Sequence, residues 1–117
     1  MEVKNILVPV DGSEGSDRAV TQAISLAEAC GAKLNFLYVA NINQLAINAC
    51  LSDAILDAVT KAGNVILDRV MDMVPTGVEK EAFSETGPPA VGILDFATDK
   101  DMEMIVMGSR GLGVVKG

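Results

Sequence analysis

Apolar residues along this chain gather in four short runs, and the stretches between the runs show a helical spacing of apolar positions. Continuous apolar runs of this length are typical of strands buried on both faces of a parallel sheet. They predict strands over residues 6–10, 34–39, 78–84 and 102–107. The run at 78–84 is the most polar, because it contains Glu79, Lys80 and Glu81, and this favours a position at a sheet edge.

Between the strands, apolar residues that recur every three or four positions predict helices over residues 13–30, about 53–74, and 87–97. Ser13 or Ser16 can cap the first helix, and Gly31 can end it. Pro75 ends the second helix, and Pro89 suits the first turn of the third. The stripes expected to face the sheet are Ala19, Val20, Ala23, Ile24 and Ala27 on the first helix, and Ile55, Val59, Ala62, Ile66, Val70 and Met73 on the second.

The alternation of strands with crossover helices predicts a single α/β domain over residues 1–117, with an open, doubly wound parallel sheet. The polar third strand favours the strand order 3-2-1-4. In that order the direction of winding reverses between the first and fourth strands, and ligands of such sheets bind at the carboxyl ends of the strands beside the reversal. The two loops that leave these strands, residues 9–13 and 108–117, are therefore the candidate ligand-binding segments.

The composition narrows the class of function. With 9 basic and 16 acidic residues the net charge is −7, so neither nucleic acid nor an anionic membrane is an expected partner. Three Phe, one Tyr and no Trp also leave few rings for stacking on unpaired bases. The absence of histidine excludes Ser-His-Asp and Cys-His nucleophile systems and His-ligated zinc. Cys30 and Cys50 form no CxxC pair and are expected to be free thiols. No signal peptide or membrane helix is predicted, so the expected location is the cytoplasm.

The segment 108–117 contains four glycines in ten residues, together with Ser109 and Arg110. Glycines allow backbone amides to approach an anion closely, which favours a phosphate cradle, whereas an ordinary strand-to-helix turn has the same composition. Walker A is excluded, because Val114 and Val115 stand where Lys and Ser/Thr are needed after Gly108 and Gly113. The G-x-G-x-x-G dinucleotide pattern is not matched either.

Asp11, at the end of the first strand, is the other candidate. Its carboxylate could accept hydrogen bonds from a ribose hydroxyl or a base amino group, or help to hold a divalent cation. Alternatively, it satisfies backbone amides in the Asp11-Gly12-Ser13 turn, as aspartate commonly does. The residues alone leave both roles open.

Three motifs together make the chain resemble the universal stress protein family: V-P-V-D-G-S at residues 8–13, G-P-P-A at 87–90, and M-G-S-R-G-L-G at 107–113. The resemblance covers the chain from end to end. It implies a Rossmann-like fold of the adenine nucleotide alpha hydrolase type, with a five-stranded parallel sheet of order 3-2-1-4-5. Its first four strands agree with the order argued above.

The resemblance also implies adenine-nucleotide binding, which belongs to members with the motif G-x2-G-x9-G-[ST]. Gly108 and Gly111 match its first two glycines. Asp11 matches the aspartate that contacts the nucleoside, and Val39 matches the position whose backbone meets adenine. The implied nucleotide-binding residues are Pro9, Val10, Asp11, Val39, Met107, Gly108, Ser109, Arg110, Gly111 and Gly113.

The chain departs from the family pattern at its end. The last glycine and the Ser/Thr of the motif would be positions 121 and 122, whereas the sequence stops at Gly117. Roughly 25 residues, enough for the last helix and the fifth strand, are expected to be missing from a truncated chain. The fourth strand is then expected to be an uncovered apolar edge.

The leading hypothesis is a stress-response module that binds ATP, or AMP or ADP, as a regulatory ligand, with Mg²⁺ or Mn²⁺ as a candidate companion. One alternative is a slow ATPase, although Asp11 is the only nearby carboxylate to act on water. Another is an interaction protein that binds no nucleotide. Because family members commonly dimerise through the fifth strand, a longer form is expected to be a homodimer, and the oligomeric state of this chain stays open.

Overall fold

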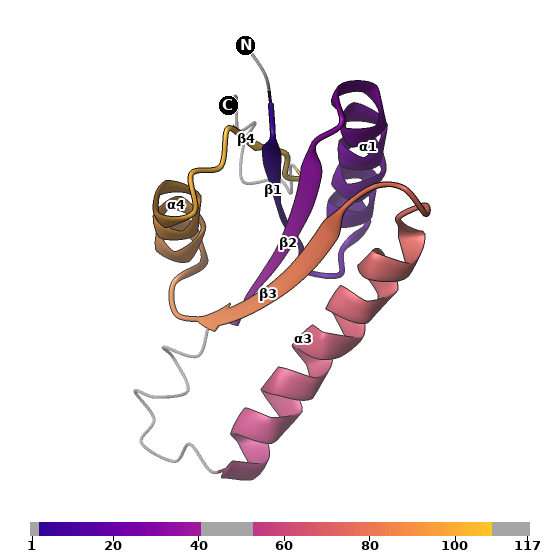
Figure 1. Ribbon diagram of the computed structural model, residues 1–117. Helices are drawn as coiled ribbons and strands as arrows, with labels where there is room; N and C mark the ends of the chain where they lie inside the picture. Colours follow the sequence, from indigo (N-terminus) through magenta and orange to yellow (C-terminus); the bar gives the residue numbers. More distant parts are fainter. Residues whose placement is uncertain (1–2, 41–52, 109–117) are drawn as a thin grey trace.

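The computed structural model describes residues 3–40 and 53–108 of the chain. Strands and helices alternate along these residues, as the sequence pattern predicts (Figure 1). The elements are β1 (Asn5–Pro9), α1 (Glu14–Cys30), β2 (Lys33–Ala40), α3 (Asp53–Met73), β3 (Lys80–Thr86), α4 (Pro89–Asp99) and β4 (Met104–Ile105).

The strands form one parallel sheet in the order β3-β2-β1-β4, which confirms the predicted order and the edge position of β3. β1 lies in the middle, where Leu7 pairs with Asn35 of β2 and with Ile105 of β4. The winding therefore reverses between β1 and β4, and the carboxyl ends of these two strands lie side by side.

All four strands differ in extent from the prediction, β1 and β2 by one residue at each end and the other two by more. β3 begins at Lys80 rather than at residue 78, because Val78 is part of a turn in which its N–H donates to the carbonyl of Pro75 over 3.3 Å. β4 is assigned to two residues rather than to 102–107. Backbone hydrogen bonds to β1 nevertheless continue on both sides of it, from Glu103 N–H to the Asn5 carbonyl and from Val106 N–H to the Leu7 carbonyl.

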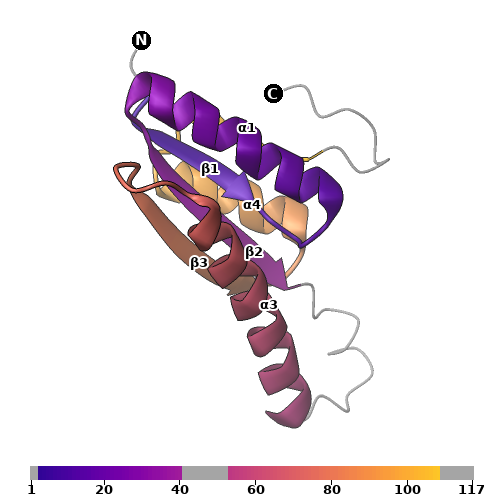
Figure 2. The same cartoon turned by 90° about the vertical axis from the view of Figure 1, so that its right-hand side faces the viewer.

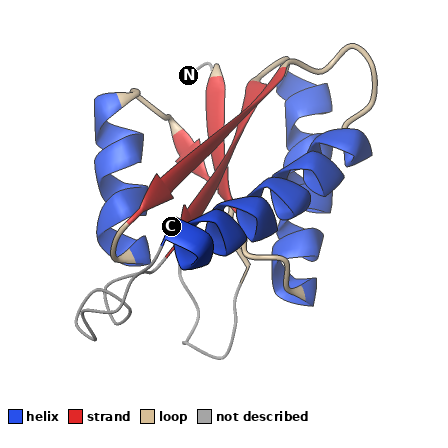
Figure 3. Cartoon of the chain, turned by 90° about the horizontal axis from the view of Figure 1, so that it is seen from below, coloured by secondary structure: helices blue, strands red, loops and turns tan. Residues whose placement is uncertain are grey.

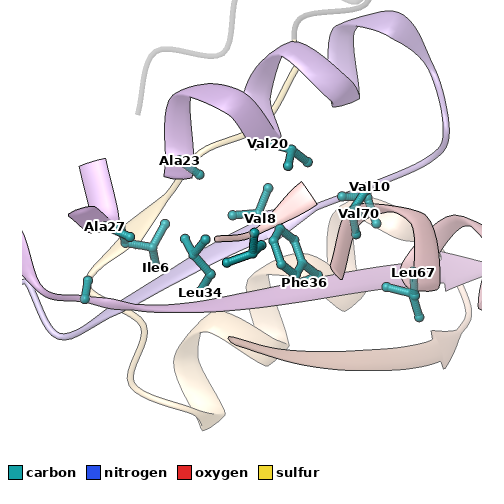
Figure 4. Close-up of a cluster of buried hydrophobic side chains, with 12 residues drawn as sticks. Ile6, Val8, Val10, Val20, Ala23, Ala27, Leu34, Phe36, Leu67 and Val70 are labelled. Carbon is teal, nitrogen blue, oxygen red and sulfur yellow. The ribbon is translucent and has the colours of Figure 1, made fainter. Parts of the chain in front are cut away.

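Helices cover both faces of the sheet: α1 and α3 lie on one face and α4 on the other (Figures 2 and 3). Because side chains alternate along a strand, each strand contributes to two separate cores. The core under α1 and α3 contains Ile6, Val8, Leu34 and Phe36, all fully buried (Figure 4). The core under α4 consists of Leu7, Leu37 and Phe96, with half-buried neighbours.

α1 begins and ends as its sequence predicts. The hydroxyl of Ser13, not that of Ser16, accepts the N-terminal cap bond, which comes from the backbone N–H of Ser16 over 3.1 Å. Gly31 ends the helix in the left-handed conformation, with φ of 72°, and its N–H donates to the carbonyl of Ala27. The predicted stripe is confirmed, since Ala19, Val20, Ala23 and Ala27 are buried and Ile24 packs against the same core.

The predicted stripe on α3 is wrong in part. Val70 is buried as expected, but Ala62 and Met73 are exposed. The buried row instead contains Gly63, Leu67 and Val70, followed by Val74 just beyond the helix. Two features explain the difference. The ring of Tyr38 on β2 occupies the space beside Gly63, and the N-terminal half of α3 extends past the carboxyl ends of the strands (Figures 1 and 2). The side chain of Ile55 lies outside the described residues.

Cys30, at the end of α1, is a free and exposed thiol, which confirms the prediction for that residue; Cys50 lies outside the described residues. Within residues 3–40 and 53–108, no helix is both long and apolar enough to cross a membrane.

Candidate functional site

The turn after β1 places Asp11 at the carboxyl edge of the sheet. The backbone N–H of Val10 still donates to the carbonyl of Leu37 over 2.9 Å, and the Val10 side chain is 5% exposed in the larger core. Asp11 is the first exposed residue after the strand, and Gly12 follows with φ of 85°, a conformation that favours glycine. Because the side chain of Val10 is buried, this residue can face a ligand only with its backbone.

The carboxylate of Asp11 is oriented by the turn itself. Its Oδ1 accepts a hydrogen bond of 2.9 Å from the backbone N–H of Ser13. This confirms the turn role considered for Asp11. Asp11 is also exposed, and its ligand role stays a prediction.

The first turn of α1 is bound tightly to the same segment. The backbone N–H of Asp11 donates to the Oγ of Ser16 over 3.2 Å, while the N–H of Ser16 donates to the Oγ of Ser13. Ser16 is 4% exposed, and Asn35 is the other buried polar residue that the structure describes. The turn and the helix thus form one hydrogen-bonded unit.

Gly108, the first residue after the end of β4 that belongs to the glycine-rich segment, packs directly on this unit. A Cβ atom at position 108 would lie 2.5 Å from the carbonyl carbon and oxygen of Gly15 and 2.9 Å from the backbone nitrogen of Ser16. Such distances leave no room for any side chain, so the backbone after β4 runs against the backbone of α1. Gly108, where the second candidate loop begins, therefore lies against the first turn of α1, which directly follows the first candidate loop.

Three apolar residues lie at the carboxyl edge of the sheet, beyond the smaller core. Leu7, Leu37 and Ile105 belong to the smaller core, and two residues further along the same segments are Pro9, Val39 and Met107. Pro9 and Val39 are half-buried and Met107 is 37% exposed, so each presents part of its side chain to solvent. Because side chains alternate along a strand, these three residues continue the smaller core toward the carboxyl edge of the sheet, the edge at which Asp11 lies.

An ion pair joins α1 to α3 next to the turn. The guanidinium of Arg69 makes two hydrogen bonds to the carboxylate of Asp17, Nη1 to Oδ2 and Nη2 to Oδ1, each of 3.0 Å. The hydrogen bonds and the charge of Asp17 raise the pKa of Arg69, so the guanidinium stays protonated. The negative charge of Asp17 at the helix start is thereby balanced. The side chain of Ile66, one turn earlier on α3, lies against Gly12.

Four of the predicted site residues, Ser109, Arg110, Gly111 and Gly113, lie outside the described residues. Their proposed contacts with ribose and phosphates stay predictions. In the part of the chain that the structure describes, no group of three or more Cys, Asp or Glu side chains is placed to hold a metal ion.

Sequence reasoning missed two features of this site. The helical pattern indicates only a capping role for Ser16. Its spacing from Asp11 and Ser13, which places all three in one turn, is the signal for their mutual hydrogen bonds. The pairing of Arg69 with Asp17, 52 residues away, has no local signal in the sequence.

Comparison with known proteins shows to which family the chain belongs. The model of the universal stress protein family matches residues 2–117. Universal stress protein YxiE of Bacillus subtilis is 31% identical over 121 aligned positions, which cover 95% of this chain and 82% of the relative. A universal stress protein structure from Burkholderia pseudomallei superimposes with a TM-score of 0.77 and 27% identity, covering 93% of this chain and 83% of that one.

Two further solved structures share the fold and contain a nucleotide. A universal stress protein in complex with cAMP has a TM-score of 0.66 and 24% identity, with 98% of this chain and 80% of that one covered. A family protein of Arabidopsis thaliana with AMP bound has a TM-score of 0.71 and 20% identity, with 97% and 81% covered. The match of the family model over nearly the whole length, with the identity to YxiE, shows that this chain belongs to the universal stress protein family.

Proposed function

We propose that this chain binds an adenine nucleotide, ATP or AMP, at the carboxyl edge between β1 and β4, and acts as a regulatory module of the stress response. The observation that carries the proposal is the contact of Gly108 with the first turn of α1. It brings the Asp11 turn and the start of the glycine-rich segment to one place, at the reversal of winding where ligands of open α/β sheets bind. Two structural relatives, one in complex with cAMP and one with AMP bound, support the same class of ligand.

The chemistry of the edge suggests how the ligand is oriented. The Asp11 carboxylate repels phosphates and accepts hydrogen bonds from hydroxyl or amino groups, so it belongs at the nucleoside end. Pro9, Val39 and Met107 supply the apolar surface that an adenine ring requires. The phosphates then extend toward the start of α1 and the segment 109–113, where the positive end of the helix dipole favours an anion.

A divalent cation, Mg²⁺ or Mn²⁺, fits this arrangement as a companion of the phosphates. Magnesium sites at nucleotides commonly use one or two carboxylates together with phosphate oxygens and water. In the Asp11-Gly12-Ser13 turn, Asp11 is the carboxylate that would bind it. The cation would balance phosphate charge on a protein whose own net charge is −7.

Equilibrium dialysis of the 117-residue chain against ATP, AMP and cAMP, with and without Mg²⁺, tests the proposal. Asp11→Asn keeps an acceptor for the Ser13 amide and removes the charge, so the turn is preserved while the bond to the ligand is weakened. We expect about tenfold weaker binding, because hydrogen bonds to charged groups contribute about 1.5–3 kcal/mol.

The matched control is Asp99→Asn at the far end of α4, where an exposed carboxylate of the same charge is removed. It should leave the affinity unchanged. The absence of saturable binding of all three nucleotides to the unaltered chain would overturn the proposal, and equal losses in the two variants would show that only net charge matters.

A further inference from the structure

The turn after β1 is closed by a ring of three hydrogen bonds. The backbone N–H of Asp11 donates to Ser16 Oγ over 3.2 Å, that of Ser16 donates to Ser13 Oγ over 3.1 Å, and that of Ser13 donates to Asp11 Oδ1 over 2.9 Å. Each residue donates with its main chain and accepts with its side chain. The orientation of the Asp11 carboxylate therefore depends on the other two residues.

Ser16 has a second contact, which it makes with Gly108. Its backbone nitrogen is among the atoms nearest to Gly108, 2.9 Å from where a Cβ at that position would lie. Ser16 is also the buried member of the ring, at 4% exposure, whereas Asp11 is exposed and Ser13 is intermediate. One buried residue thus contacts both halves of the candidate site.

We propose that Ser16 is a positioning residue for the nucleotide site: its hydroxyl fixes the main chain of Asp11, and its backbone nitrogen, together with the carbonyl group of Gly15, forms the surface on which Gly108 rests. This inference rests on the proposed function, since it assigns to Ser16 a part in the same site. Ser16 is too buried to contact the ligand itself, and it acts through Asp11 and Gly108.

The effect of Ser16 on binding can be separated from its effect on folding. Replacing it with alanine removes the acceptor for the Asp11 N–H, but it leaves the bond from the Ser16 main chain to Ser13 Oγ, which caps α1. Because Asp11 is exposed, its N–H can bond to water after the change. Alanine also suits the first turn of a helix. The variant should therefore fold normally with a looser turn.

Amide hydrogen exchange, followed residue by residue by NMR in the ligand-free 117-residue chain, measures the turn directly. In Ser16→Ala we expect the Asp11 amide to exchange at least about tenfold faster, because its acceptor is gone. The affinity for ATP and AMP should fall about tenfold, while the melting temperature stays within about 4 °C of the unaltered chain. Ser16→Thr, which keeps a hydroxyl, should restore slow exchange and affinity together.

Ser25→Ala, an exposed serine further along α1, is the matched control and should change none of these quantities. Unchanged exchange at Asp11 in Ser16→Ala overturns the inference, and so does faster exchange with unchanged affinity. If the unaltered chain binds no nucleotide, the proposed function fails, and the inference that rests on it fails as well. Faster exchange of the Asp11 amide in Ser16→Ala would in that case still show that Ser16 holds the turn. The two failures are therefore distinguishable.

Discussion

The two faces of the sheet are built very differently. Among the residues that the structure describes, twelve buried residues form one continuous core under α1 and α3, whereas three form a thin core under α4. Val91 and Leu94 of α4 are 52% and 62% exposed. The apolar residues of the candidate site, Pro9, Val39 and Met107, continue the thin side. The comparison indicates that the α1–α3 face supplies most of the stability, and that the proposed nucleotide site lies on the side with fewer buried residues.

The largest expected effect compares the same substitution in the two cores. Phe36→Ala should destabilise the protein by about 3–5 kcal/mol, because Phe36 is fully buried in the larger core. Phe96→Ala should cost less, about 2–3 kcal/mol, because its half-buried neighbours, including Phe83 at a ring separation of 4.8 Å, can close over the space. Urea unfolding of both variants measures the difference. An equal or larger loss in Phe96→Ala would contradict the comparison.

A glycine on each face gives a smaller and sharper test at the carboxyl end of β2. A Cβ at Gly63 of α3 would lie 2.6 Å from two ring carbons of Tyr38, whereas one at Gly92 of α4 would lie 3.3 Å from a methyl group of Val39. Gly63→Ala should therefore destabilise the protein by about 1–3 kcal/mol through overpacking. Gly92→Ala should change stability by less than about 1 kcal/mol, because the milder contact is offset by the better helix propensity of alanine.

Thermal unfolding of the two glycine variants, with the double variant as a check on additivity, separates these outcomes. If Gly92→Ala were the more damaging change, the α4 face would be the more rigid one. In that case the assignment of loose packing to the side of the candidate site would have to be reversed.

The smallest effect concerns the ion pair on the α1–α3 face. Arg69→Ala should cost less than about 1 kcal/mol, because Arg69 and Asp17 are both partly exposed. The loss should shrink in 1 M salt, where the charges are screened. Since the pKa of Arg69 is raised, the contribution of its charge persists across neutral pH and is lost under strongly alkaline conditions. A large, salt-independent loss would show that the pair, rather than the apolar core, joins the helices.

Much of the fold follows from local patterns. Apolar runs predict the strands, the polar third run predicts the edge, and Ser13 and Gly31 mark the ends of α1, because strand burial and helix capping depend on neighbouring residues. The rotation of α3 about its own axis, which decides the residues that face the sheet, does not follow from local patterns. Helical periodicity gives the spacing of a buried stripe, but the choice between Ala62 and Gly63 depends on the ring of Tyr38 beneath the helix.

The candidate site also combines features that the sequence predicts with features that it does not. The sequence by itself determined the family, the order of the strands, and the two loops that hold Asp11 and Gly108, because motifs and alternation are properties of the chain as written. Only the tertiary structure decided that Gly108 rests on Gly15 and Ser16, that Ser16 holds Asp11, and that Arg69 pairs with Asp17. These contacts join segments up to 93 residues apart, and their distances are set by how the elements pack, which no local pattern specifies.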